Sequence, residues 1–142
     1  MDGITVISDN ADLNLTSIRE YIGKGIIFHY SGNCLLGNLQ PMNDSDYLKI
    51  NLMNGNFVTE GDANITASLI ALSSQSHACT FVSNGHNVVI NGNLIIDDLY
   101  DMTEKKNFTI NHDWKIYAET YPVRVSVGSP KTFFALEYNG KD

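Results

Sequence analysis

The sequence predicts a mainly β fold: an antiparallel β-sandwich or small barrel with one short N-terminal helix. Short apolar runs recur at intervals near ten residues, and Asn-Gly dipeptides, which fit tight β-turns, separate several of them. The sixteen asparagines also favour turns over helix interiors. No repeat of fixed period is evident. However, about eight to ten short strands with asparagine-containing turns also permit a short parallel β-helix, which is the alternative fold.

Length and composition indicate one β-rich domain over residues 1–142. A chain of 142 residues buries roughly 70% of the surface that it exposes when unfolded, which is enough for a core without metals or disulfides. Apolar residues make up 43% of the chain and charged residues only 18%, so we do not expect disorder. Cys34 and Cys79 are the only cysteines, and we expect both to be buried free thiols.

The N-terminal part of the chain predicts two strands with a short helix between them. A β-branched run at residues 4–7 indicates a strand, and a polar loop at residues 8–14 follows it. Residues 25–30 form a short apolar run, which is typical of a buried strand. Between these strands lie a capping box, two isoleucines four residues apart and a closing glycine, which predict one or two helical turns: Ser17, Glu20, Ile18, Ile22 and Gly23.

A hairpin is predicted in the middle of the chain. Residues 47–53 alternate between polar and apolar side chains, as in a half-solvated antiparallel strand. The apolar face of this strand carries Leu48, Ile50 and Leu52. Asn54-Gly55 supplies a type I′ turn, and residues 56–59 form the returning strand.

The next segment predicts a helix followed by a β-meander. Residues 63–76 fit either a helix or a strand, and their alanines, together with Asp62 as an N-cap, favour the helix. Two Asn-Gly turns then alternate with apolar runs. This pattern predicts three meander strands, at residues 78–83, 86–90 and 93–97.

The C-terminal part predicts an exposed connection and further strands. Residues 97–106 are the densest charge cluster in the chain and lack a sustained apolar period, so we expect them to be exposed. Strands are then expected at residues 108–110, 114–119, 121–127 and 132–138.

Charge and targeting signals restrict the possible functions. The net charge of −7 disfavours binding to nucleic acid, because it repels a phosphate backbone. The opening residues lack the basic and apolar regions of an export signal, and no stretch approaches 18 consecutive apolar residues. We therefore expect neither export nor a membrane partner. Four N-x-S/T triplets carry little weight without an export signal; they begin at Asn14, Asn43, Asn64 and Asn107.

The common motifs of enzymes and metal sites are missing from the sequence, so we expect no catalytic residues, no cofactor and no metal. His77 and Cys79 are weak candidates for a metal site or a thiol-base pair; the competing interpretation is a turn histidine beside a buried cysteine. His112 and Asp113 are adjacent, so on a strand their side chains point to opposite faces and do not meet.

The remaining candidates each have a structural interpretation beside the functional one. We expect His29 to be a structural histidine in an apolar strand and His86 to be exposed. Asp97, Asp98 and Asp101 could hold a divalent cation if their loop folds back, and otherwise form a solvated charge cluster. Strand-face aromatics could form a sugar-stacking platform or belong to the core, and the candidates are Tyr47, Tyr117 and Tyr121.

Three functions fit a small, β-rich chain with uncharged polar residues. The leading hypothesis is a non-enzymatic structural protein that acts through protein interfaces as a homo-oligomer, such as a phage head-decoration, neck or tail protein in a virion. The alternative is a module that binds carbohydrate or protein. A second alternative is an acidic phage-encoded inhibitor of a host nucleic-acid enzyme, although the acids are dispersed along the chain. Outside a virion, the expected location is the cytoplasm.

Overall fold

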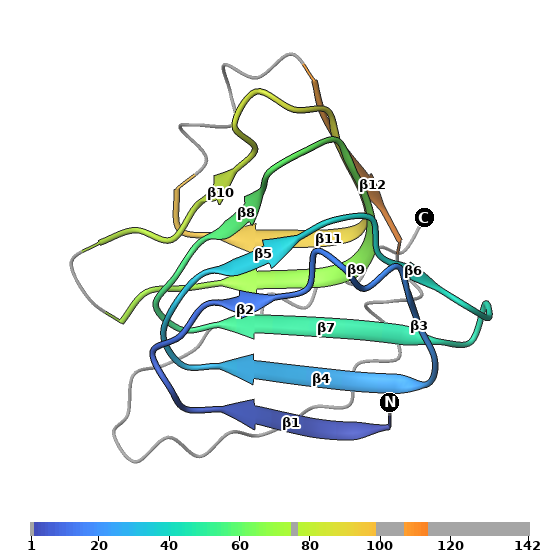
Figure 1. Cartoon of the computed structure of the whole chain (residues 1–142), viewed down its shortest axis with the longest axis horizontal. Helices are drawn as coiled ribbons and strands as arrows, with labels where there is room; N and C mark the ends of the chain where they lie inside the picture. Colours follow the sequence, from blue (N-terminus) through green and yellow to red (C-terminus); the bar gives the residue numbers. More distant parts are fainter. Residues whose placement is uncertain (1, 75–76, 99–106, 114–142) are drawn as a thin grey trace, which may run out of the picture.

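The chain winds into a parallel β-solenoid of about four turns, which the computed structural model describes for residues 2–74, 77–98 and 107–113 (Figure 1). Within these ranges every strand pairs with its neighbours in parallel, and there is no helix. The predicted antiparallel sandwich or barrel is therefore wrong, and the alternative of a short parallel β-helix describes the fold.

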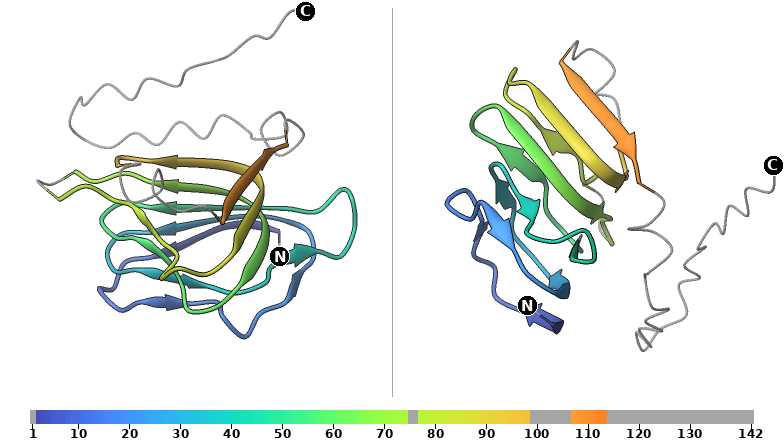
Figure 2. Two further views of the ribbon diagram at one scale, coloured as in Figure 1. Left: turned by 90° about the horizontal axis from the view of Figure 1, so that it is seen from above. Right: turned by 90° about the vertical axis from the view of Figure 1, so that its right-hand side faces the viewer.

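Three sheets form the sides of the solenoid (Figure 1). The largest contains, in spatial order, β1 (Gly3–Ile7), β4 (Lys24–His29), β7 (Tyr47–Leu52), β9 (Ala63–Ala71), β11 (Val88–Ile96) and β12 (Phe108–His112). The second contains β10 (Phe81–Val82), β8 (Phe57–Thr59), β5 (Cys34–Leu36) and β2 (Leu13–Asn14). The third contains β3 (Glu20–Tyr21) and β6 (Gln40–Pro41). Figure 2 shows β1 at one end of the stack and β12 at the other.

One coil of the solenoid takes a little over twenty residues. Gly3 pairs with Gly25 and Lys24 pairs with Tyr47, so successive coils take 22 and then 23 residues. The other two sides of each coil serve as the crossover that parallel strands require. Strand β9 is longer than β7. Its second half pairs with β7, and Ile65 in its first half forms a parallel bridge with Leu39, next to the third sheet.

Both predicted helices are wrong, because pairing between coils outweighs the local helix signals. Residues 17–22 contain β3, which pairs with β6, and Ile18 stays 42% exposed instead of facing the core. Residues 63–71 form β9. One alternating face of β9 is buried, as the strand interpretation of this segment requires: Ala63, Ile65, Ala67, Leu69 and Ala71.

The predicted hairpin and meander are also wrong. Neither residue of Asn54-Gly55 has the positive φ that a type I′ turn needs, and β8 pairs with β5 and β10 instead of β7. Asn84 and Gly85 do have positive φ values of 51° and 81°, but they join β10 to β11, which belong to different sheets. Residues 91–92 lie inside β11.

Five predicted strands are confirmed in position, and all of them are parallel: β1, β4, β7, β8 and β12. In β7 the apolar face is buried as expected, because Leu48, Ile50 and Leu52 point into the core. Several predictions lie outside the described residues, namely most of the charged connection and the strands expected at 114–119, 121–127 and 132–138.

Apolar columns run through the interior along the solenoid. Cys34, Phe57 and Phe81 lie in register in successive coils and are all 0% exposed. The Phe81 ring lies 6.1 Å from the ring of Phe57 and 5.1 Å from the ring of Phe108, which it meets edge to face. Cys34 and Cys79 are buried free thiols, as predicted.

His29 places a polar group in this apolar interior. It is 1% exposed and lies in register with Leu52, as expected of a structural histidine. Neither ring nitrogen has a hydrogen-bond partner within the described part of the chain. Burying a polar group without a partner costs about 1–3 kcal/mol, so His29 lowers the stability of the fold.

Replacing His29 with leucine is expected to raise the free energy of unfolding by about 1 kcal/mol or more, because a side chain of similar size then removes two buried polar atoms. The midpoint of urea unfolding at neutral pH measures the change. The exposed His112→Leu variant is the control and should keep the parent midpoint. A His29→Leu protein that unfolds at lower urea than the parent would contradict this expectation.

Candidate functional site

A ladder of polar side chains follows the turn that joins the first sheet to the second in each coil. Asp12 Oδ1 accepts a hydrogen bond from the Asn33 N–H at 2.8 Å. Asn33 Oδ1 accepts one from the Asn56 N–H at 3.0 Å, and Asn56 Oδ1 accepts one from the Thr80 N–H at 2.9 Å. Each side-chain oxygen thus ties one coil to the next, and either aspartate or asparagine provides that oxygen. We call Asp12, Asn33, Asn56 and Thr80 the turn ladder.

Glycines beside the turn ladder let consecutive coils approach closely. A Cβ atom on Gly55 would overlap the carbonyl oxygen of Gly32 and lie 2.6 Å from its carbonyl carbon. A Cβ atom on Gly32 would lie 2.6 Å from the carbonyl oxygen of Ala11. Both obstacles are backbone atoms, which cannot move aside as a side chain can. Glycine is therefore required at both positions.

A polar pocket of about 260 Å³ opens beside the turn ladder. Its volume lies just below the range of roughly 300–1,000 Å³ that is typical of small-molecule sites. Asparagines from two adjacent turns form one part of its wall, and the segment after β9 forms the rest. The lining residues are Asn33, Asn54, Gly55, Asn56, Ser73, His77, Ala78 and Cys79.

Two asparagines of the turn ladder, Asn33 and Asn56, line this pocket and have carboxamide NH2 groups. The oxygens of Asn33 and Asn56 accept backbone N–H groups, and neither Nδ2 atom has a partner among the described residues. Adjacent strands in a sheet lie about 4.8 Å apart, so the two NH2 groups are stacked one coil apart. Asn54 differs, because its Oδ1 accepts from the N–H and the hydroxyl of Ser74, both at 3.2 Å.

Asp97 fixes the segment that forms the other wall of the pocket. Its Oδ2 accepts hydrogen bonds from the Ser73 N–H at 2.6 Å and the Cys79 N–H at 3.1 Å. Asp97 is not among the lining residues, and the described part of the lining contains no carboxylate, lysine or arginine. The pocket is therefore built mainly from neutral polar groups.

His77 and Cys79 both line the pocket, at the positions of a turn histidine and a buried cysteine. His77 is exposed in the turn region, whereas Cys79 is 2% exposed. Burial raises the pKa of the Cys79 thiol, and the nearby Asp97 raises it further, so the neutral thiol is favoured over a nucleophilic thiolate. Burial likewise raises the pKa of Cys34 to about 12.

The remaining charged candidates do not come together in the described part of the chain. Within it, no group of three His, Cys, Asp or Glu side chains is placed to hold a metal ion. Asp98 is exposed, and Asp101 lies outside the described residues, so the proposed cation cluster stays a prediction. His112 and Asp113 follow one another at the end of β12, and His112 is exposed.

Tyr47 is a core residue and not a sugar-stacking platform. It is only 5% exposed, and the Lys24 ammonium lies 5.8 Å from the centre of its ring. Tyr117 and Tyr121 lie outside the described residues.

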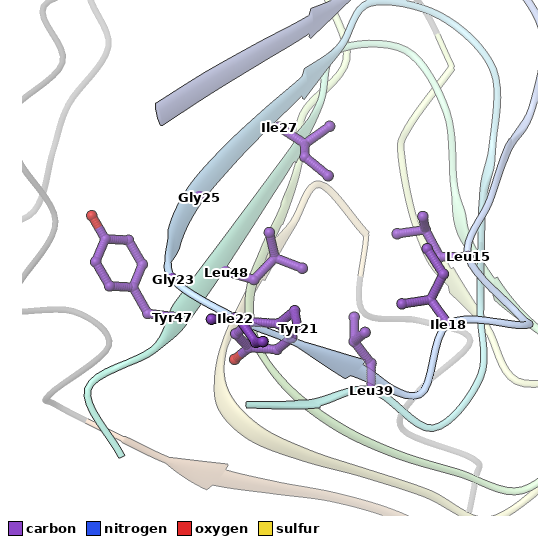
Figure 3. Close-up of a pocket in the computed structure, with 10 residues that line it drawn as sticks. All are labelled: Leu15, Ile18, Tyr21, Ile22, Gly23, Gly25, Ile27, Leu39, Tyr47 and Leu48. Carbon is purple, nitrogen blue, oxygen red and sulfur yellow. The ribbon is translucent and has the colours of Figure 1, made fainter. Parts of the chain in front are cut away.

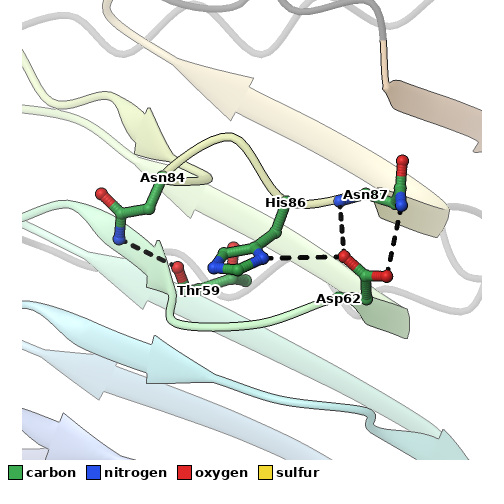
Figure 4. Close-up of polar contacts among 5 residues, drawn as sticks. All are labelled: Thr59, Asp62, Asn84, His86 and Asn87. Carbon is green, nitrogen blue, oxygen red and sulfur yellow. Dashed lines mark hydrogen bonds and ion pairs between the residues drawn. The ribbon is translucent and has the colours of Figure 1, made fainter.

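A second polar cluster lies at the turn that leads back into the six-stranded sheet (Figure 4). The carboxylate of Asp62 accepts the Asn87 N–H at 2.9 Å and the Asn87 carboxamide at 3.2 Å, and it lies 3.7 Å from His86 Nδ1. Asn84 donates to the Thr59 carbonyl at 3.0 Å. These contacts connect neighbouring coils, and the side chain of His86, which we expected to be exposed, is 39% exposed.

The Asp62 contacts predict a pH-dependent stability. Hydrogen bonds from the N–H and carboxamide of Asn87, with a smaller effect of His86, hold the pKa of Asp62 below its ordinary value of 3.8. The ionised carboxylate therefore stabilises the fold above about pH 4, and this contribution is lost as the pH falls through the lowered pKa. Urea midpoints measured from about pH 6 to pH 2 should fall, and should fall less in Asp62→Asn. An identical pH dependence in parent and variant would contradict this.

A smaller, apolar cavity of about 50 Å³ is lined by residues of the first three coils (Figure 3). The Tyr21 hydroxyl donates to the Thr66 carbonyl at 2.7 Å, and burial raises the pKa of this phenol. So small a volume holds at most a few water molecules, and we assign it no function. The lining residues are Leu15, Ile18, Tyr21, Ile22, Gly23, Gly25, Ile27, Leu39, Tyr47 and Leu48.

Sequence reasoning missed the asparagines of the pocket, because it treated them only as turn residues. A usable signal was present: a small residue, then Asp or Asn, then an apolar residue, recurring in the first three coils. It occurs at Ala11-Asp12-Leu13, Gly32-Asn33-Cys34 and Gly55-Asn56-Phe57.

Comparison with known proteins leaves the function to be inferred from the structure itself. The chain matches no protein-family model, and neither the curated proteins nor the solved structures contain a significant match. In the described ranges, no helix is long and apolar enough to cross a membrane.

Proposed function

We propose that this protein is a non-catalytic binding module for a neutral carbohydrate, which it holds in the polar pocket beside the turn ladder. The observation that carries the proposal is the pair of carboxamides of Asn33 and Asn56. Their oxygens accept hydrogen bonds from the backbone of the next coil, and their NH2 groups have no partner in the part of the chain that the structure describes. Sugar hydroxyl and ring oxygens accept such hydrogen bonds, and Ser73 and His77 supply further polar groups in the same pocket.

The charges around the pocket favour a neutral saccharide over an anion. Among the described residues, no lysine or arginine lines the pocket, and the net charge of −7 repels phosphate or sulfate groups. Each hydrogen bond between neutral groups contributes about 0.5–1.5 kcal/mol. The described lining residues include no Phe, Tyr or Trp for stacking, so we expect weak binding, with a Kd on the order of 1 mM, or about −4 kcal/mol.

Changing asparagine to aspartate tests the role of the NH2 donors without disturbing the hydrogen bonds of the turn ladder. In Asn33→Asp and Asn56→Asp the side-chain oxygen stays, and Asp12 shows that a carboxylate accepts the backbone N–H equally well. The NH2 donors are lost. Each change is expected to weaken saccharide binding by up to about tenfold, with little effect on unfolding. Calorimetric titration with glucose, galactose, mannose and N-acetylglucosamine, and with their disaccharides, measures the loss.

The matched control is Asn38→Asp. The Oδ1 atom of Asn38 accepts the Asn64 N–H at 2.8 Å, but Asn38 does not line the pocket. This variant should bind the saccharide as the parent does. An equal loss in all three variants, or no binding of any tested saccharide by the parent protein, would reject the proposal.

A structural role in an assembly such as a virion is the second candidate function. The observation in its favour is that the first coil carries four of the eight large apolar side chains that the described residues expose: Ile4, Val6, Ile18 and Ile22. Such a role requires self-association through a defined surface.

A further inference from the structure

Strand β1 is an open edge of the six-stranded sheet in the described part of the chain. It pairs with β4 on one side only. Its outward side chains, Ile4 and Val6, are 55% and 69% exposed, and they lie in register with Ile26 and Phe28 of β4. An exposed apolar edge of this kind is a template for pairing with another strand.

The sequence of β1 contains nothing that opposes such pairing. Natural sheets protect their edges with lysine, proline or a bulge, and Gly3–Ile7 contains no charged residue and no proline. The Ile7 carbonyl accepts the Tyr30 N–H and therefore points toward β4. Successive strand residues direct their backbone groups to opposite edges, so the N–H and C=O groups of Ile4 and Val6 face the open edge.

We propose that β1 is the surface at which two copies of this chain associate, with the two β1 strands running antiparallel about a two-fold axis at Thr5. In this register the backbone groups of Ile4 bond to those of Val6 of the second copy, and the reverse pair forms by symmetry. The proposal does not depend on the saccharide site.

The proposed register is self-complementary. Ile4 lies opposite Val6 of the second copy, and the side chains of both lie on the same face of the joined sheet. The apolar row formed with Ile26 and Phe28 of β4 therefore continues from one copy into the other. Asp2 lies opposite Ser8 of the second copy. The two Asp2 residues are then about six residues, or about 20 Å, apart. This distance is well beyond the screening length of about 8 Å at physiological salt, so repulsion between the two carboxylates does not oppose the dimer.

Sedimentation equilibrium of the full chain tests the association. We expect a concentration-dependent dimer of the 15.7 kDa chain. Val6→Lys places like charges close together across the axis and should raise the dimer Kd by about 100-fold or more. The matched control is Ile95→Lys, which changes another outward apolar side chain of the same sheet, 44% exposed and on β11. This control should dimerise as the parent does.

A cross-link tests the two-fold axis itself. Thr5 faces Thr5 of the second copy in a non-hydrogen-bonded pair, where Cα atoms lie about 4.5 Å apart, within the range of a disulfide. Oxidised Thr5→Cys should therefore give a covalent dimer, whereas Thr109→Cys on the exposed face of β12 should not. The proposal is overturned by a monomer at every concentration tested, by a dimer that survives Val6→Lys unchanged, or by a dimer that Thr5→Cys does not cross-link.

Discussion

Replacing Gly55 with alanine is expected to destabilise the fold by at least about 3 kcal/mol or to prevent folding. The added Cβ atom would overlap the carbonyl oxygen of Gly32, which belongs to the turn of the preceding coil. The Gly32 N–H also donates to the Asn54 carbonyl at 3.3 Å, so the two turns cannot separate without losing this contact. Circular dichroism and urea unfolding of the purified variant measure the loss.

The matched control for Gly55 is Gly61→Ala. A Cβ atom on Gly61 meets no atom within 4 Å, and its φ is not in the left-handed region. This variant should keep or slightly increase the parent stability, by up to about 1 kcal/mol, because alanine restricts the unfolded chain. If Gly55→Ala unfolded at the same urea concentration as Gly61→Ala, the close stacking of the turns would be refuted.

Replacing Phe81 with alanine is expected to cost about 3–5 kcal/mol, which corresponds to a fall in Tm of roughly 10 °C or more. Phe81 is 0% exposed and contacts the ring of Phe57 on β8, its neighbour in the same sheet, and the ring of Phe108 on β12, the end strand of the six-stranded sheet. Its removal leaves a cavity that two other rings line. Differential scanning calorimetry measures the change in Tm.

Ile110→Ala is the control for Phe81, since it removes another large apolar side chain from the same end of the solenoid. Ile110 is 44% exposed, so its loss should cost less than about 1 kcal/mol. Similar Tm values for Phe81→Ala and Ile110→Ala would show that the aromatic column contributes little to stability.

The positions of several strands could be predicted, because each strand carries its own alternation of buried and exposed side chains. In β7, for example, Leu48, Ile50 and Leu52 identify the buried face. The pairing of the strands could not be predicted in this way. The same alternation serves parallel and antiparallel sheets, and each strand here pairs one coil away, as Lys24 with Tyr47 shows.

The wrong elements share a physical cause, which is that local signals compete with stacking between coils. Asn54-Gly55 has the composition of a hairpin turn, but Gly55 is glycine because the carbonyl of Gly32 leaves no room for a Cβ atom. The capping box at Ser17 and Glu20 favours a helix, but backbone pairing of β3 with β6 takes its place.

Part of the candidate site could be recognised from the sequence. His77 and Cys79 stand out by residue type, and both line the pocket. Asn33 and Asn56 did not stand out, because the role of their NH2 groups becomes evident only when the next coil is known to bond to their oxygens. The contact between the two residues depends on the 23-residue coil, which brings Asn33 next to Asn56, as the pairing of Cys34 with Phe57 shows.

The most direct test of carbohydrate binding observes the proposed donors themselves. In a ¹⁵N-labelled sample, the side-chain NH2 signals of Asn33 and Asn56 are assigned from their aspartate variants and followed while a neutral saccharide is added. We expect both signals to shift in proportion to saturation, with the Asn38 signal unchanged as an internal control. If saturating saccharide leaves the Asn33 and Asn56 signals in place, or shifts only residues outside the pocket, then the turn ladder does not form the binding site.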